Sequence, residues 1–248
     1  MVDAKPSGSI DEQHSVARTV VLHLLPGLLF LAFYVAALPV VRALGFPSLM
    51  AIFLAIVFVF VPFQLGYLVY RARRDGTSFG EVVRYREPVP KGRFAGLVFS
   101  LFAWSALCAV LFTPPLDAFF LENVFSWLPE SFLLTEDFSR YSAAVLVVTW
   151  VSGLVLNGFV APVAEELYFR GYLLPRISRL GAWAPLVNTV LFSLYHFFTP
   201  WQAVGRVVSL VPMVVYAVWW TRNVYVGMVV LVLGNVASML LLLPLFFG

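Results

Sequence analysis

Long apolar stretches recur along most of this sequence, and they restrict the chain to folds that a lipid bilayer can hold. A helix needs about 20 mostly apolar residues to cross the hydrocarbon core, where each unpaired backbone group costs several kcal/mol. The stretches that meet this length are Val20–Val41, Pro47–Tyr70, Phe94–Phe112, Ala143–Val160, Ala182–Phe198, Ala203–Trp220 and Val224–Phe247. Some are short and interrupted by proline, so six or eight spans also fit the pattern. We predict an all-α, polytopic integral membrane protein with about seven transmembrane helices.

The composition excludes an ordinary soluble domain. Of 248 residues, 61% are apolar and 12% are charged, and the mean hydropathy is +0.92. Soluble domains are roughly half apolar and about a quarter charged. We expect a polar cytoplasmic tail at residues 1–18 and a single helical membrane domain at residues 19–248. The first span does not resemble a cleaved signal peptide, because Asp11 and Glu12 lie where a signal would be basic.

Arginines are concentrated in the connection between the second and third predicted spans. This connection holds Arg71, Arg73, Arg74, Arg84, Arg86, Lys91 and Arg93. Basic residues in short loops favour the cytoplasmic side, so we expect the N-terminus to be cytoplasmic and the C-terminus to lie outside. The net charge of +3 then reflects topology, and no nucleic-acid partner is expected. Binding of lipid headgroups by the Arg71–Arg93 loop is an alternative use of these charges.

Few ionisable or amide side chains interrupt the later spans, and each is a candidate for function because such residues are costly in a membrane. Glu166 and Arg170 are four apart on a helix with the acid first, which favours an ion pair. Glu165 then remains without a local partner, and a buried carboxylate can serve as a general base. His196 can orient the same water or carry a proton. Asn235 can donate a hydrogen bond to an oxyanion.

Each of these residues also has a structural explanation. The Glu166–Arg170 pair can fasten a helix end, and Glu165 can be solvated at the membrane surface. His196 precedes a turn and can be an ordinary interfacial histidine. Asn235 can join two helices by a hydrogen bond, which is the commoner use of a membrane asparagine. Spacing alone leaves the structural and the catalytic interpretations open.

The order of these residues is similar to that of a known family. The run Glu165-Glu166-Leu167-Tyr168-Phe169-Arg170 is followed by Phe192-x-x-x-His196 and by Asn235 in the last span. Together they resemble the CAAX protease and bacteriocin-processing family of intramembrane peptidases, whose eukaryotic members are the type II CAAX prenyl endopeptidases. The similarity covers roughly Trp150 to Ser238, within a peptidase-like core at about residues 143–247.

The resemblance implies a helical membrane core that opens toward the cytoplasm. The catalytic residues that it implies are Glu165, His196 and Asn235, with Glu166, Arg170 and Phe192 in supporting positions. In that family the first glutamate and the histidine activate a water, and the asparagine is thought to contribute the oxyanion hole.

The last motif departs from the family pattern. The family usually has His-x-x-x-Asn, whereas Leu231 stands four residues before Asn235 here. Catalytic zinc sites normally have three firm ligands and a water, and no second histidine is left to complete such a set with Glu165, His196 and Glu166. We therefore expect no required cofactor, disfavour zinc, and expect a glutamate-activated water. Loss of one oxyanion donor costs on the order of 10²–10³ in turnover.

Simple topology places Glu165 and His196 at opposite faces of the membrane, because one ends an inward span and the other an outward span. For them to meet, the chain must break and turn back around residues 162–179, or the fifth span must start deeper. Two prolines and Gly171 favour a broken or re-entrant segment at 162–179, which is tolerated where it lines a protein cavity. We predict such a cavity with Glu165 and His196 on its wall.

Two functions fit these residues best. The first is an intramembrane endopeptidase that cuts a membrane-associated or lipidated protein near the cytoplasmic face of a prokaryotic plasma membrane. The second is a catalytically impaired family member that acts as a membrane regulator or scaffold for a partner membrane protein. The intact acid and base residues favour the enzyme, while Leu231 favours the regulator. A solute transporter is disfavoured, because paired broken spans are lacking.

Overall fold

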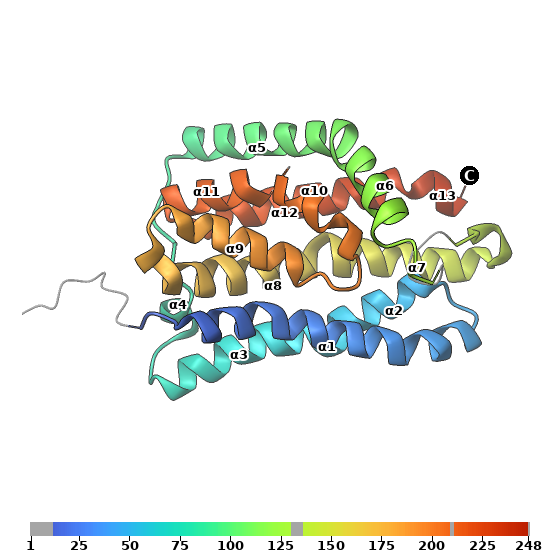
Figure 1. Ribbon diagram of the computed structural model, residues 1–248, viewed down its shortest axis with the longest axis horizontal. Coiled ribbons are helices and arrows are strands. Elements are labelled where there is room, and N and C mark those ends of the chain that lie inside the picture. The colour runs from blue at the N-terminus through green and yellow to red at the C-terminus, as the bar shows by residue number, and fades with distance from the viewer. Residues whose placement is uncertain (1–11, 130–135, 209–210, 248) are drawn as a thin grey trace, which may run out of the picture.

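The protein is described by a computed structural model over residues 12–129, 136–208 and 211–247, and no β-strand forms within these ranges. The helices lie side by side along one long axis (Figure 1). The first half of the chain forms α1 (Val16–Ala43), α2 (Ser48–Ala55), η1 (Ile56–Phe60), α3 (Val61–Arg74), α4 (Phe79–Val82), α5 (Lys91–Leu111) and α6 (Thr113–Asn123). The second half forms η3 (Phe138–Arg140), α7 (Ala143–Val155), η4 (Leu156–Val160), α8 (Ala161–Glu165), η5 (Glu166–Leu173), η6 (Leu174–Leu180), α9 (Trp183–Leu194), η7 (Pro200–Gln202), α10 (Ala203–Val208), α11 (Val211–Thr221), α12 (Val224–Leu241) and α13 (Leu243–Phe247).

Five helical segments of the described chain are long and apolar enough to cross a membrane. They are Val16–Ala43, Ser48–Arg74, Lys91–Leu111, Ala143–Leu180 and Val224–Phe247. A sixth crossing forms if the segments Pro200–Val208 and Pro212–Thr221, bent by 53°, count as one. The remaining apolar helix, Trp183–Leu194, has 12 residues and is too short to cross. The all-helical, multi-pass prediction is confirmed, and seven was an approximate count.

The predicted break at residues 162–179 is wrong, because helix continues from Ala143 to Leu180 as one 38-residue segment. A proline lacks a backbone N–H, and its ring crowds the carbonyl four residues earlier. The wide π-helical turn η4 ends at Val160, just before Pro162, and a turn of this kind can absorb the misfit without ending the helix. Pro62 follows the π-turn η1 in the same way. The bent pair lies later in the chain, at Pro200–Val208 and Pro212–Thr221.

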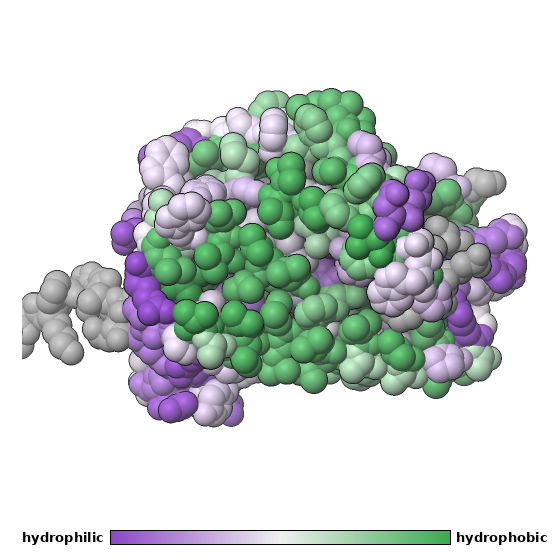
Figure 2. Space-filling view, in the orientation of Figure 1, coloured by the Kyte–Doolittle hydropathy of each residue, from purple (hydrophilic) through white to green (hydrophobic). Residues whose placement is uncertain are grey.

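One end of the bundle carries most of the arginines. This arginine-rich end is defined by Arg71, Arg73, Arg74, Arg84, Arg86, Arg93, Arg176, Arg179 and Arg222, which lie at helix ends and in their connections. Figure 2 shows hydrophilic side chains at this end, on the left, and a broad apolar band beside them along the helices. Such an apolar belt is what lipid-facing helices present to a bilayer. The long axis of the bundle therefore runs across the membrane.

The core lies where α1, the second span (α2, η1 and α3) and α9 meet the fourth span. Its large buried aromatic side chains include Phe30, Tyr168, Phe169 and Tyr195. Helix α1 approaches the end of α9 so closely that a Cβ atom at Gly27 would overlap the carbonyl oxygen of Tyr195. This contact fixes the position of the residues that follow α9.

Candidate active site

Glu165 and the end of α9 meet at a similar depth in the bundle. Glu165 lies in the interior of the 38-residue fourth span, about 22 Å from its end at Leu180 at 1.5 Å per residue. Helix α9 then runs back for only 12 residues, or about 18 Å, before it ends at Leu194. The long fourth span and the short helix α9 thus place Glu165 and the residues after Leu194 at a similar depth. This requires neither a break around residues 162–179 nor a fifth span that starts deeper.

The Tyr195 hydroxyl makes the direct connection, because it donates a hydrogen bond to Oε1 of Glu165. Both side chains are buried. His196 follows Tyr195, and the two ring centroids are 4.1 Å apart. The structure thus places Glu165 and His196 around one tyrosine, and no direct hydrogen bond joins them among the described residues.

The His196 ring is held by the last turn of α9, which ends two residues before it. Its Nδ1 lies 2.9 Å from the carbonyl oxygen of Phe192, so Nδ1 carries the proton in the neutral ring and Nε2 is the acceptor. The Phe192 ring also packs against the imidazole, with centroids 5.0 Å apart. This arrangement suits a histidine that receives or orients a proton at Nε2.

Glu166 and Arg170 form a fully buried pair behind the site, as the spacing predicts. The Nε atom of Arg170 lies 3.2 Å from Oε1 of Glu166, and both side chains have no exposed surface. The pair is a close charge contact without hydrogen-bond alignment, because none of its polar atoms meets the geometric criteria for a hydrogen bond. The Arg170 guanidinium also stacks 3.8 Å from the ring centre of Phe192. At Gly227 of α12 a Cβ atom would overlap Glu166, so this glycine leaves room for the carboxylate.

Asn235 is turned toward its own helix. Its Nδ2 donates a hydrogen bond of 2.9 Å to the carbonyl oxygen of Leu231, and no hydrogen bond connects it to Glu165 or His196 among the described residues. Leu231 is buried in a second apolar cluster with Leu101 of α5 and Val214 of α11. Leu231, which stands where the family motif usually has a histidine, is therefore a packing residue in this structure.

Comparison with known protein families assigns the segment that carries these residues. Residues 147–237 match the family model described as type II CAAX prenyl endopeptidase Rce1-like, over less than half of the chain. This segment, called the Rce1-like segment below, is similar to that family. This family consists of membrane proteases that act on membrane-associated proteins. The match therefore supports the general function of a CAAX-type intramembrane protease. Comparisons with curated proteins and with solved structures gave no match.

The Rce1-like segment does not offer a zinc site of ordinary composition. In the described ranges, no three histidine, cysteine, aspartate or glutamate side chains lie close enough together to hold a metal ion. Hydrolytic zinc sites normally need three such ligands and a water. The described residues around Glu165 therefore do not fit a hydrolytic zinc site of this composition.

Two residues of the site were missed by the sequence analysis. Tyr195 had only its position beside His196 as a signal, and a tyrosine in an apolar helix usually indicates packing. Arg206 of α10 donates hydrogen bonds to Oγ1 of Thr199 at 2.8 Å and to Oε1 of Gln202 at 2.6 Å. Its charge also acts on Glu165 and Tyr195, although it forms no ion pair in the described part of the chain. In the sequence, Arg206 is recognisable only as a basic residue near the end of a predicted span.

Proposed function

We propose that this protein is an intramembrane endopeptidase in which Glu165 activates a water molecule for attack on a peptide carbonyl. The observation that carries the proposal is the hydrogen bond from Tyr195 to Glu165 next to His196, inside a segment of a protease family. The bond fixes one carboxylate oxygen and leaves the other for water. A carboxylate held in an apolar site is a stronger base than one in water.

The proposed reaction has two steps. Glu165 takes a proton from the water while the oxygen of the water bonds to the carbonyl carbon of the substrate. This step gives a tetrahedral oxyanion. The carbon–nitrogen bond then breaks, and the proton passes to the leaving amine directly or through Nε2 of His196.

We assign the oxyanion donor to Asn235, on the resemblance of its motif. In its present rotamer the amide donates to Leu231, so it must rotate to reach an oxyanion. With leucine at residue 231, the oxyanion would have one donor fewer than the usual motif supplies. We therefore expect slow turnover.

We assign the arginine-rich end to the cytoplasmic side of a prokaryotic plasma membrane, since basic loops are retained there during insertion. The substrate would be a membrane-associated peptide or a lipidated C-terminus that reaches Glu165 from that side. A regulator or scaffold that binds another membrane protein is the second candidate, and the packing of Leu231 favours it.

Proteolysis in lipid nanodiscs tests the proposal. The purified protein would be incubated with prenylated and unmodified membrane peptides, with and without a zinc chelator, and the products would be identified by mass spectrometry. Cleavage that the chelator leaves unchanged would support the water-activating glutamate. Loss of cleavage in chelator would require a metal, and absence of cleavage from folded protein would favour the regulator.

A further inference from the structure

A pocket of about 530 Å³ opens at the arginine-rich end, and neither Glu165 nor His196 lines it. Its walls come from the segment before α1, the end of α3, helix α4 with the residues after it, and η6. Both acidic and basic side chains face it, so its character depends on which charges are already paired.

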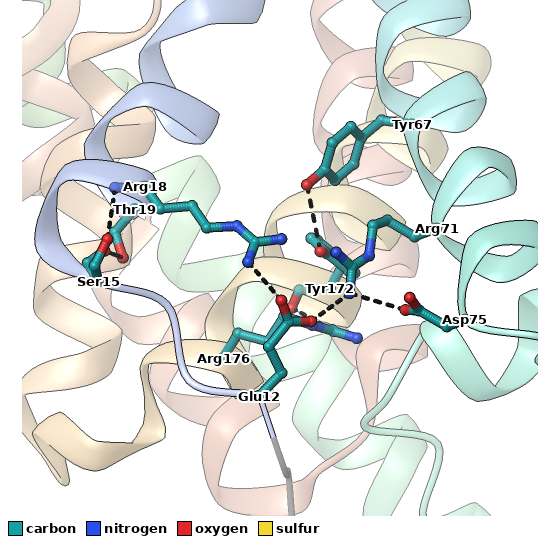
Figure 3. A network of polar contacts seen from close by, with 9 residues as sticks. All are labelled: Glu12, Ser15, Arg18, Thr19, Tyr67, Arg71, Asp75, Tyr172 and Arg176. Carbon is teal, nitrogen blue, oxygen red and sulfur yellow. Dashed lines mark hydrogen bonds and ion pairs between the residues drawn. The ribbon is translucent and has the colours of Figure 1, made fainter.

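Two of the pocket acids are committed to arginines outside its wall. Figure 3 shows the carboxylate of Glu12 between Arg18 and Arg71, and it accepts hydrogen bonds from both. Burial raises the pKa of Glu12, but the hydrogen bond and charge of Arg18 and the charge of Arg71 outweigh this and hold the pKa below its ordinary value. Asp75 accepts a hydrogen bond of 2.8 Å from the same Arg71 guanidinium. These two carboxylates and two guanidinium groups balance one another.

The other two acids are also engaged. Glu81 accepts hydrogen bonds of 2.7 Å from the backbone N–H and from the hydroxyl of Ser78, as the closing member of a capping box on α4. Glu87 pairs with Arg222 at 3.7 Å. All four acids of the pocket therefore have partners of their own.

The arginines of the pocket lack such partners. Arg176 is buried, and its guanidinium stacks 3.7 Å from the ring centre of Tyr172. It donates to two backbone carbonyl groups, while its Nε–H is buried without a hydrogen-bond partner. The Nε–H of Arg84 is also buried and unsatisfied. In the described ranges, neither of them forms an ion pair with an acid.

A third arginine extends the same positive surface. Arg86 is exposed and donates to the carbonyl oxygen of Gly80, which leaves its charge uncompensated by any ion pair in the described residues. The charges of Arg84 and Arg71 act unfavourably on Arg176, and the charge of Glu12, which acts favourably, is already shared by hydrogen bonds to Arg18 and Arg71. Burial, together with the charges of Arg18 and Arg176, also lowers the pKa of His14 to about 3. The interior of this end is thus a region of positive field with unused N–H donors.

We propose that the pocket binds a phosphate-bearing anion between Arg84 and Arg176, with Arg86 at its rim. A phosphate group accepts several charge-assisted hydrogen bonds, and guanidinium groups match its geometry. The pocket volume admits a phosphate with an attached organic group. Its place at the end of the transmembrane helices is the level of lipid headgroups, so the anion is either a lipid headgroup or a soluble phosphate.

Thermal unfolding of the full chain in detergent tests this proposal, because a ligand that binds only the folded protein raises the Tm in a saturable way. The probes are inorganic phosphate, short-chain phosphatidylglycerol and short-chain phosphatidylcholine, each compared with chloride at equal ionic strength. We expect phosphatidylglycerol to raise the Tm and phosphatidylcholine to have no effect. Stabilisation by phosphate as well would indicate a soluble anion, and stabilisation by phosphatidylglycerol alone would indicate a lipid headgroup.

The variants Arg84→Gln and Arg86→Gln supply the site-specific test. We expect Arg84→Gln to raise the apparent Kd for the anion by at least about 10-fold, because one hydrogen bond to a charged group is lost. Arg86→Gln changes an exposed side chain and serves if Arg84→Gln folds poorly. Arg179→Gln removes an exposed charge from the same end outside the pocket, and it should bind like the wild type. The proposal is overturned if neither anion stabilises the wild type, or if all variants bind equally.

Discussion

The hydroxyl of Tyr195 and the carboxylate of Glu165 form a buried hydrogen bond that ties the end of α9 to the middle of the fourth span. This bond does two things at once. It orients one oxygen of the carboxylate, and it holds the residue before His196 at the same depth as Glu165. The candidate site therefore depends on the tyrosine as much as on the two residues of the family motif.

The substitution Tyr195→Phe should slow cleavage with little loss of packing. The phenyl ring can keep its stacking on Phe60, whose centroid lies 5.5 Å away, while Glu165 loses its donor. A hydrogen bond to a charged group contributes about 1.5–3 kcal/mol, which corresponds to about 10- to 100-fold in kcat if it acts in the transition state. Steady-state kinetics in nanodiscs would measure this, and KM should change little.

Tyr168→Phe is the matched control for this change. The Tyr168 hydroxyl donates a 2.8 Å hydrogen bond to the carbonyl oxygen of Leu22, away from Glu165. Its loss should lower stability by about 1 kcal/mol and leave kcat unchanged. Equal loss of activity in both variants would show that Tyr195 acts through packing alone.

The buried pair Glu166–Arg170 should be a strong determinant of stability. Replacing Arg170 with methionine leaves the Glu166 charge buried and unpaired, which costs about 3–5 kcal/mol in comparable sites. The double variant Glu166→Gln/Arg170→Met should recover part of that loss, because no charge remains. Thermal or denaturant unfolding of the purified variants would measure both effects, and a single variant as stable as the wild type would contradict the assignment.

Gly27→Ala should separate α1 from the end of α9. A Cβ atom at this position overlaps the carbonyl oxygen of Tyr195, so the helices must move apart, and we expect lower stability together with reduced cleavage. Gly66→Ala in α3 is the control, since nothing lies within 4 Å of its added methyl group. An alanine there should be neutral or stabilise the helix by about 0.5–1 kcal/mol. Similar behaviour of the two variants would contradict the close packing of α1 on α9.

Leu231→His restores the usual family residue and tests the proposed oxyanion site. Gain of an oxyanion donor should raise kcat, by up to the order of 10²–10³ that such a donor contributes. Leu233→His places the same residue on the exposed face of α12 and should give no gain. An active protein whose kcat is unchanged by Leu231→His would count against an oxyanion role for this position.

Much of the fold follows from the apolar stretches, because backbone hydrogen bonding in lipid leaves helices as the natural solution. The length of the fourth span did not follow from them. The apolar pattern predicts an end at Val160 and a break near Pro162, but the π-helical turn η4 absorbs the proline and the helix continues to Leu180. Hydropathy does not register such turns, since they change the backbone and leave the composition unchanged.

The site was predictable where a motif fixed its spacing. Glu166 and Arg170 pair as their four-residue separation indicates, and Phe192 contacts both Arg170 and His196. Tyr195 and Arg206 reach the site only through the tertiary packing of α9 and α10, which no local pattern encodes. The hydrogen bond of Asn235 to Leu231 was equally invisible in the sequence, because it depends on the rotamer of the side chain.

The most direct test of the account compares the wild type with Glu165→Gln in nanodiscs on one membrane peptide that the wild type cleaves. Glu122→Gln is the matched control, because it makes the same change at an exposed glutamate of α6. We predict that Glu165→Gln remains folded and loses cleavage almost completely, while Glu122→Gln cleaves like the wild type. Full cleavage by a folded Glu165→Gln variant would contradict the central claim that this carboxylate activates the water.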